Sequence, residues 1–137
     1  MGLEAAIITT AAAHSGFANL IGTSSAMRLR PVTAAQSTTY PCVSYRIVSE
    51  TRDESMGTTS ELVRRRVEFQ VQDNSANAYS DVVDVSAQLV DCFNRWSGTV
   101  SGFVVHESFI DNVTDLAYDL DTDVYTRVVD IIFICGA

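Results

Sequence analysis

The stretch Thr59–Ser75, TSELVRRRVEFQVQDNS, alternates apolar and polar residues and predicts a strand that buries one face. Val63, Val67, Phe69 and Val71 share the apolar face. The alternation divides the arginine triplet, because Arg64 and Arg66 lie with Glu68 on the polar face and Arg65 lies on the apolar one. An arginine on an apolar strand face requires a carboxylate partner. We therefore predict that at least one of the three arginines bridges to an acidic group on a neighbouring strand or subunit.

The composition is that of one globular domain spanning residues 1–137. The apolar fraction is 47% and the charged fraction is 19%, and no apolar run approaches the roughly 18 residues of a membrane span. The N-terminal segment has no basic region of the kind that begins a secretory signal, so we expect a soluble protein without a membrane partner. Three widely spaced cysteines predict buried free thiols rather than a disulfide framework or a zinc site.

The charge balance argues against a tight binder of nucleic acid. The chain has 17 acidic residues against nine basic ones, all nine of them arginine, and its net charge is −8. The arginine triplet lies inside a strand with Glu61 and Glu68 nearby, and no exposed aromatic residues are interleaved with it. The balance remains compatible with a protein past which DNA slides.

The first half of the chain predicts one helix and two strands. Apolar residues spaced by three and four predict a helix over residues 3–21 that stops at Gly22. Residues 22–39 have the composition of a loop, with one brief strand at Met27–Arg30 closed by Pro31. A strand follows from Pro41, and the polar residues 49–60 predict a long hairpin connection to the strand quoted above.

The second half predicts one helix and two more strands. The helix has N-cap candidates in Asp73 and Ser75 and runs to Gly98. A strand over 102–110, an aspartate-rich loop over 111–123 and a final strand over 123–136 complete the chain. The final strand is apolar on both faces, which predicts that it is central or covered on both sides. The order α-β-β-α-β-β favours an α+β fold with a mainly antiparallel sheet of about four strands and two helices on one face.

The aspartate-rich loop resembles a calcium loop only at its start. Asp119, Asp121 and Asp123 give the D-x-D-x-D spacing, and Asp130 lies at the twelfth position. However, Val124 occupies the position where the sharp turn needs glycine, and Asp130 belongs to a strand pattern. We interpret the loop as a solvated hairpin tip without a metal.

No motif indicates catalysis or a cofactor. The two histidines, His14 and His106, lie in regular elements with apolar neighbours, and the sequence contains no GxSxG, HExxH, GxGxxG or GxxxxGK[ST] motif. We therefore expect neither an enzyme nor a nucleotide-binding protein.

Several segments, taken in order, resemble one protein family. An alanine-rich N-terminal helix ending near LIG precedes an R-x-R-P segment and a Gln-containing loop. YPCVSYRIVS follows, with Pro41, Val43 and Tyr45 at the family's Pro-hydrophobic-x-Tyr positions. The RRRVEFQVQDNSANAYSDVVDVSAQLVDCF unit and the closing YDLDTDVYTRVVDIIFI complete the series. Together these segments resemble the tail-completion, or tail-terminator, proteins of long-tailed bacteriophages.

The resemblance implies a structural role in a virion. Such proteins form a ring, commonly a hexamer, at the head-proximal end of the tail tube, assembled in the host cytoplasm. The implied partners are copies of the same chain, the tail tube protein and the head–tail connector or neck protein, with DNA passing through the channel without specific binding. As subunit or partner interface residues, we predict the following set: Arg46, Arg64, Arg65, Arg66, Arg127, Asp119, Asp121 and Asp123.

Two other classes stay open at this level. One is a different ring component, such as a neck protein or a tail tube subunit, and a tube subunit would polymerise into long tubes by itself. The other is a small intracellular enzyme or ligand-binding domain that uses His106 and the aspartate loop. In that case, replacing His106 and Asp121 with alanine would abolish an activity and leave assembly untouched.

Overall fold

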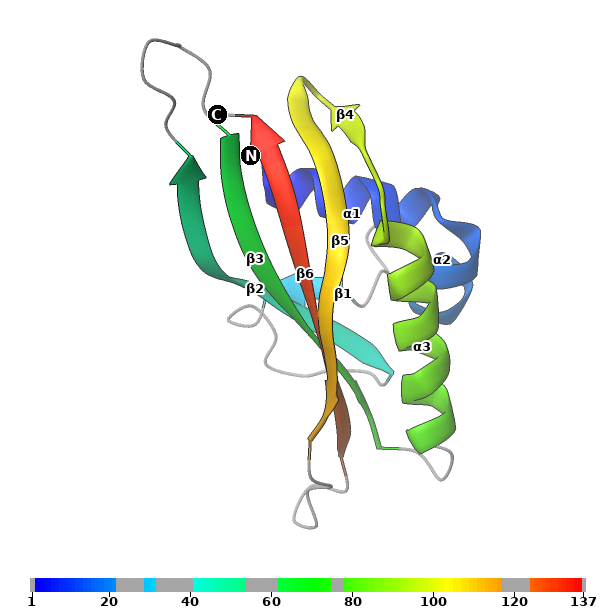
Figure 1. The fold of residues 1–137 in the computed structure, drawn as a ribbon. Coiled ribbons are helices and arrows are strands. Elements are labelled where there is room, and N and C mark those ends of the chain that lie inside the picture. The colour runs from blue at the N-terminus through cyan, green and yellow to red at the C-terminus, as the bar shows by residue number, and fades with distance from the viewer. Residues whose placement is uncertain are drawn as a thin grey trace, which may run out of the picture.

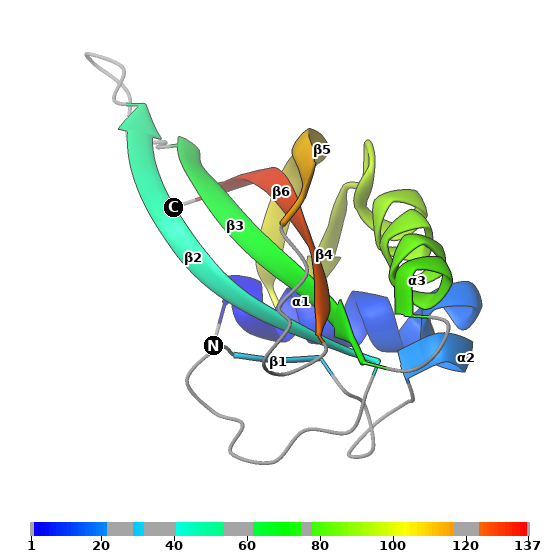
Figure 2. The same cartoon turned by 90° about the horizontal axis from the view of Figure 1, so that it is seen from below.

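A twisted sheet runs through the molecule, and the three helices of the described residues lie on the same side of it (Figures 1 and 2). The computed structural model describes residues 2–21, 29–31, 41–53, 62–74, 78–116 and 124–136. Its elements follow in chain order: α1 (Leu3–Ala13), α2 (Ser15–Ile21), β1 (Leu29–Pro31), β2 (Cys42–Asp53), β3 (Leu62–Asp73), α3 (Ala78–Phe93), β4 (Gly98–Val100), β5 (Phe103–Asp115) and β6 (Tyr125–Gly136).

The strand order in the sheet is β1-β2-β3-β6-β5-β4. Every neighbouring pair is antiparallel except β1 and β2, which run parallel. The predicted α+β class with a mainly antiparallel sheet is therefore confirmed. The sheet has six strands rather than about four, because two short strands of three residues each, β1 and β4, pair with the outer sides of β2 and β5.

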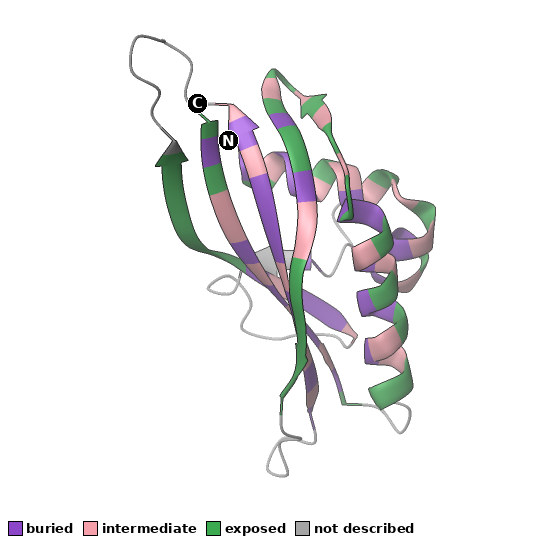
Figure 3. Ribbon diagram, in the orientation of Figure 1, coloured by how far each residue is buried: buried purple, intermediate pink, exposed green. Residues whose placement is uncertain are grey.

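The centre of the sheet is β3 paired with β6, and it carries the core. Val67, Phe69, Ile131 and Phe133 are completely buried beneath the helices, where Phe93 of α3 packs edge-on against Phe133. Burying a large apolar side chain stabilises the fold by roughly 1.5–3 kcal/mol. The prediction that the last strand is central is confirmed. Figure 3 shows burial concentrated on these strands and on the inner sides of the helices.

The N-terminal helix is two helices, not the single one predicted over 3–21. His14 adopts an extended backbone (φ −86°, ψ 104°), which ends α1. Its side chain then begins α2, because the Phe17 backbone N–H donates to His14 Nδ1 at 3.2 Å, as at other helix N-caps. With Nδ1 as acceptor, the proton lies on Nε2, which is 3.1 Å from Asp91 Oδ2 of α3. The predicted stop at Gly22 lies outside the described residues.

The second predicted helix ends five residues early, at Phe93. Arg95 has a positive φ of 55°, so the chain leaves the helix there instead of reaching Gly98, which belongs to β4. The Arg95 N–H donates to the Ser108 carbonyl oxygen, and the Ser108 N–H donates to the Trp96 carbonyl oxygen, both at 2.8 Å. Pairing with β5 thus replaces the last helical turn. At the other end, the N-cap candidate Asp73 is the last residue of β3, and Ser75 lies outside the described residues.

Two segments predicted as loops are partly strand. β2 continues through the polar residues 49–53, and β5 continues through 111–115. Polar composition suggested loops there, but each polar stretch has a neighbouring strand that supplies backbone hydrogen bonds and oppositely charged side chains. The brief strand predicted at Met27–Arg30 is observed at Leu29–Pro31. None of the helices in the described residues has the length and apolar run needed to cross a membrane.

Candidate assembly surfaces

The arginine triplet is divided between the two faces of β3, as strand alternation requires. Arg65 lies on the helix-covered face, and Arg64 and Arg66 lie on the opposite face, which we call the open face because no helix covers it (Figure 1). The prediction that at least one of the three bridges to an acidic group on a neighbouring strand is confirmed by Arg65 and Arg66.

Arg65 is paired across the sheet with Glu50 of β2. Its Nε and Nη2 donate to Glu50 Oε1 at 3.2 and 3.1 Å, and the two residues are direct register partners. The guanidinium carbon also lies 5.8 Å from the centroid of the Phe103 ring. The Arg65 side chain is only 21% exposed, so the carboxylate and the aromatic ring together replace much of its hydration.

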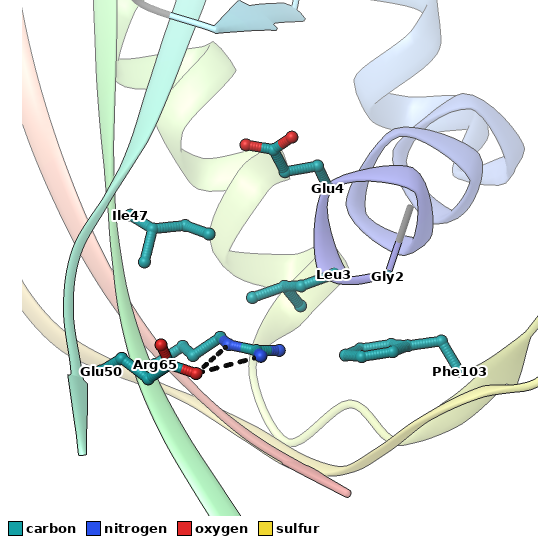
Figure 4. A pocket seen from close by; sticks show the side chains of 7 residues that line it. All are labelled: Gly2, Leu3, Glu4, Ile47, Glu50, Arg65 and Phe103. Atoms are coloured by element: carbon teal, nitrogen blue, oxygen red, sulfur yellow. Dashed lines mark hydrogen bonds and ion pairs between the residues drawn. The ribbon is translucent and has the colours of Figure 1, made fainter. Parts of the chain in front are cut away.

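These residues line an open hollow of about 380 Å³ between the start of α1 and the sheet (Figure 4). Gly2, Leu3 and Glu4 form the helix side, and Ile47 and Phe103 form the flanks. The hollow holds one guanidinium against the two carboxylates Glu4 and Glu50, so its charge does not favour a phosphate or a nucleotide.

The open face carries a second set of ion pairs. Arg66 bonds Asp111 of β5 and lies 3.9 Å from Asp130 of β6, so one guanidinium joins three adjacent strands. Partial burial, together with the neighbouring Glu68, raises the pKa of Asp130. These pairs hold β3, β6 and β5 in register, which is a structural function of charge at a partly exposed site.

Arg46 of β2 extends the same set toward the edge of the sheet. It lies beside its register partner Glu68, with Nε 3.3 Å from Glu68 Oε1. Gln70 donates to the same oxygen at 2.9 Å. The hydrogen bond from Gln70, with the Arg46 bond and charge, lowers the pKa of Glu68 despite its partial burial.

Arg127 forms the corresponding pair at the far end of β6. Its Nε donates to Asp115 Oδ1 at 2.7 Å, and this bond lowers the pKa of Asp115. A second group of Arg127, Nη1, reaches the Ser86 hydroxyl of α3 at 3.4 Å.

The predicted interface residues therefore do not form one cluster. Arg65 and Arg127 lie on the helix-covered side, Arg46 and Arg66 lie on the open face with carboxylate partners, and Arg64 is exposed there without an ion pair to the described residues. The remaining three, Asp119, Asp121 and Asp123, lie outside the described residues.

Chemistry-bearing side chains elsewhere are dispersed. In the described ranges, no group of three or more His, Cys, Asp or Glu residues could hold a metal ion. His106 is exposed on β5. The three cysteines are free and buried, as predicted, and burial raises the pKa of the Cys92 thiol to about 12.

The sheet edges were not singled out by the sequence. β1 pairs only with Val43–Tyr45 of β2, and β4 pairs only with Phe103–Val105 of β5. Beyond these pairings and the backbone hydrogen bonds of Ser108 with Arg95 and Trp96, residues 46–53 and 109–115 have a paired neighbour on one side only among the described residues (Figure 1). One signal was present in the sequence, since the adjacent apolar residues Ile47 and Val48 break the alternation, and Val48 lies at a β-bulge.

In fold, the chain is similar to a solved component of a virion. The structure is that of the virion of a native gene transfer agent (GTA) particle, with a TM-score of 0.77 and 13% sequence identity. The match covers 99% of this chain and 96% of that chain. No protein-family model and no curated protein sequence matches the chain. The similarity establishes a shared fold over the whole length of both chains.

Proposed function

We propose that this protein is a structural component of a phage-like virion that forms a ring at the head-proximal end of the tail tube. In this role it terminates tail growth and provides the joining surface for the head, and it performs no catalysis. The observation that carries the proposal is the fold shared, end to end, with a chain of a gene transfer agent virion. The order of segments that resembles tail-terminator proteins narrows the proposal from virion component to terminator.

Two physical features support a role in assembly. The sheet has long edges with unpaired backbone groups, which are ready-made surfaces for pairing with another chain. The hollow beside α1 is lined by both polar and apolar residues, and its single guanidinium faces two carboxylates, so it has no excess of positive charge. Both features suit a protein that binds other proteins more than one that binds a small anionic ligand.

The charge of the chain is compatible with DNA passage. A ring at the head–tail junction must let the duplex through without holding it, and phosphate contacts from basic residues would slow that passage. The net charge of −8 and the absence of lysine oppose such contacts. Most arginines of the described sheet are also neutralised by carboxylates beside them.

The proposal is tested by assembling particles in cells from which this protein has been removed and imaging the products. We expect filled heads without tails, together with unattached tail tubes of uncontrolled length. Supplying the protein in trans should restore joined virions. A normal yield of joined virions in its absence would contradict the proposal. Normal tube length with unjoined tails would instead indicate a neck component, and the loss of all tubes would indicate a tube subunit.

A further inference from the structure

Three of the seven large apolar residues exposed among the described residues lie on the two free edges of the sheet. On β2, Ile47 and Val48 are 41% and 45% exposed, and on β5 Val113 is 41% exposed, with Leu116 directly after the strand at 45%. A long sheet edge that exposes apolar side chains is either an aggregation hazard or a site for a partner. Neither free segment, 46–53 or 109–115, contains proline or lysine, although each has a β-bulge and charged side chains, which also protect edges.

The two edges have opposite strand directions. From β2 the sheet passes through three antiparallel pairings, to β3, β6 and then β5, so β5 runs opposite to β2 (Figure 1). Rotation about an axis parallel to the strands leaves strand direction unchanged. In a ring built by such a rotation, β2 of one subunit therefore meets β5 of the next in antiparallel orientation, which is the pairing found throughout this sheet.

The two edges also lie at the same height in the sheet. Following register partners across the strands, Arg46 is level with Asn112 and Ser49 is level with Phe109. Both pairs belong to the open face. Neighbouring subunits of a flat ring would therefore bring these free segments together without an axial shift.

Charge favours pairing between unlike edges. The free part of β5 carries Asp111 and Asp115 and no arginine, whereas the free part of β2 balances Arg46 and Arg52, with side chains 56% and 55% exposed, against Glu50 and Asp53. Two β5 edges would place carboxylates against carboxylates, and like charges directly opposite are destabilising. A β2 edge against a β5 edge avoids this repulsion and brings Arg46 near Asp111, because Arg46 is level with Asn112.

We infer that the subunit boundary is formed by the free edge of β2, residues 46–53, pairing with the free edge of β5, residues 109–115, of the next copy. This inference rests on the proposed ring and names the surfaces that build it. The contact is head-to-tail, because each subunit uses two different edges, and head-to-tail contacts that close produce rings. The open face then continues from subunit to subunit as one sheet, with the helices on the opposite side.

Engineered disulfides test the boundary directly. Arg46→Cys is combined in turn with Phe109→Cys, Asn112→Cys and Thr114→Cys, all on the open face, so that shifts of the register by a rung are covered. After oxidation, non-reducing gels should show a ladder of covalent multimers for at least one pair. Each single variant should remain monomeric on the gel, since a head-to-tail contact never brings two copies of the same residue together.

Two controls test whether the cross-links are specific to the inferred boundary. The wild-type protein should give no multimers, because its three cysteines are buried. Arg46→Cys combined with Tyr79→Cys, an exposed position on α3, should give no ladder either. Covalent dimers from Arg46→Cys alone would overturn the inference by showing a β2–β2 contact. A ring seen by native mass spectrometry with every pair monomeric would overturn this boundary and leave the proposed function intact. A protein that neither forms rings nor binds tail tubes would overturn both.

Discussion

The centre of the sheet and its edges both carry large apolar side chains, but the centre buries them and the edges expose them. At the centre, Phe69, Phe133 and Ile131 are completely buried under the helices, and apolar side chains there stabilise the fold. At the edges, Ile47, Val48 and Val113 are about two-fifths exposed, and nothing in the described residues covers them. Apolar content alone therefore does not distinguish the buried core of this chain from its exposed edges. Position in the strand order does.

The largest effect is expected at the centre. Phe133→Ala removes a ring that packs edge-on against Phe93 and Trp96, and the cavity left behind should lower the free energy of unfolding by about 3–5 kcal/mol. Urea denaturation followed by circular dichroism measures this change. A loss below about 1 kcal/mol would show that the centre is not the source of stability.

The next prediction separates assembly from folding. Val48→Asp places a charge on the free edge of β2, where the boundary inferred above would bury it, so rings should dissociate. The free energy of unfolding of the monomer should change by no more than about 0.5 kcal/mol, because the site is exposed. Tyr79→Asp, at an exposed position on α3, is the matched control and should leave ring formation intact. Light scattering after size-exclusion chromatography measures the mass of each variant. A Val48→Asp protein that still forms rings would show that the free edge of β2 is not needed for assembly.

A smaller effect is expected from Arg65, which lies between the two regions. Arg65→Ala leaves Glu50 without its partner and removes the contact with Phe103, so we expect a loss of about 1 kcal/mol. Arg64→Ala, on the same strand but exposed, should change stability by less than about 0.5 kcal/mol. Urea denaturation measures the free energy of unfolding of both variants. Equal decreases would show that the pairing of Arg65 with Glu50 does not contribute to stability. An Arg65→Ala protein that terminates tails normally would count against an assembly role for this residue.

The smallest effect concerns the Arg127–Asp115 pair and depends on pH. Because the pKa of Asp115 is lowered in the folded protein, the pair contributes stability above the ordinary aspartate range, about pH 4, and this contribution disappears as the pH falls through the folded pKa. Arg127→Ala should therefore be less stable than the wild type at pH 7 and should approach it below that range. NMR titration of the Asp115 carboxyl should also show its pKa rising in the variant. A stability difference that grows on acidification would contradict this sign.

Much of the fold could be predicted because strand alternation is a local property. Alternation predicted which residues of β3 face the core, namely Val63, Val67, Phe69 and Val71. The last strand is apolar on both faces, and this pattern predicted the central position of β6. The break at His14 could not be predicted, because it depends on a side chain that caps one helix while it contacts Asp91, 77 residues away. The extensions of β2 and β5 depend likewise on cross-strand partners that are distant in sequence.

The candidate surface was predicted only in part. Splitting of the arginine triplet followed from alternation, and so did the need of Arg65 for a carboxylate. Its partner, Glu50, could not be identified, because the register of β2 against β3 changes at the bulge beside Ile47. Apart from the break in alternation at Ile47 and Val48, the free edges could not be predicted, since they are defined by how short β1 and β4 are relative to the strands they flank. Whether the predicted set of arginines and aspartates contacts other subunits stays a prediction.

The most direct test of the central claim is native mass spectrometry of the purified protein, combined with negative-stain imaging, alone and after addition of tail tubes. The account predicts one closed ring, with a mass that is a small whole multiple of 14.9 kDa, formed either by the protein alone or at the ends of tubes. Long tubes formed by the protein alone would identify a tube subunit instead. A protein that stays at 14.9 kDa and never associates with tail tubes would contradict the account.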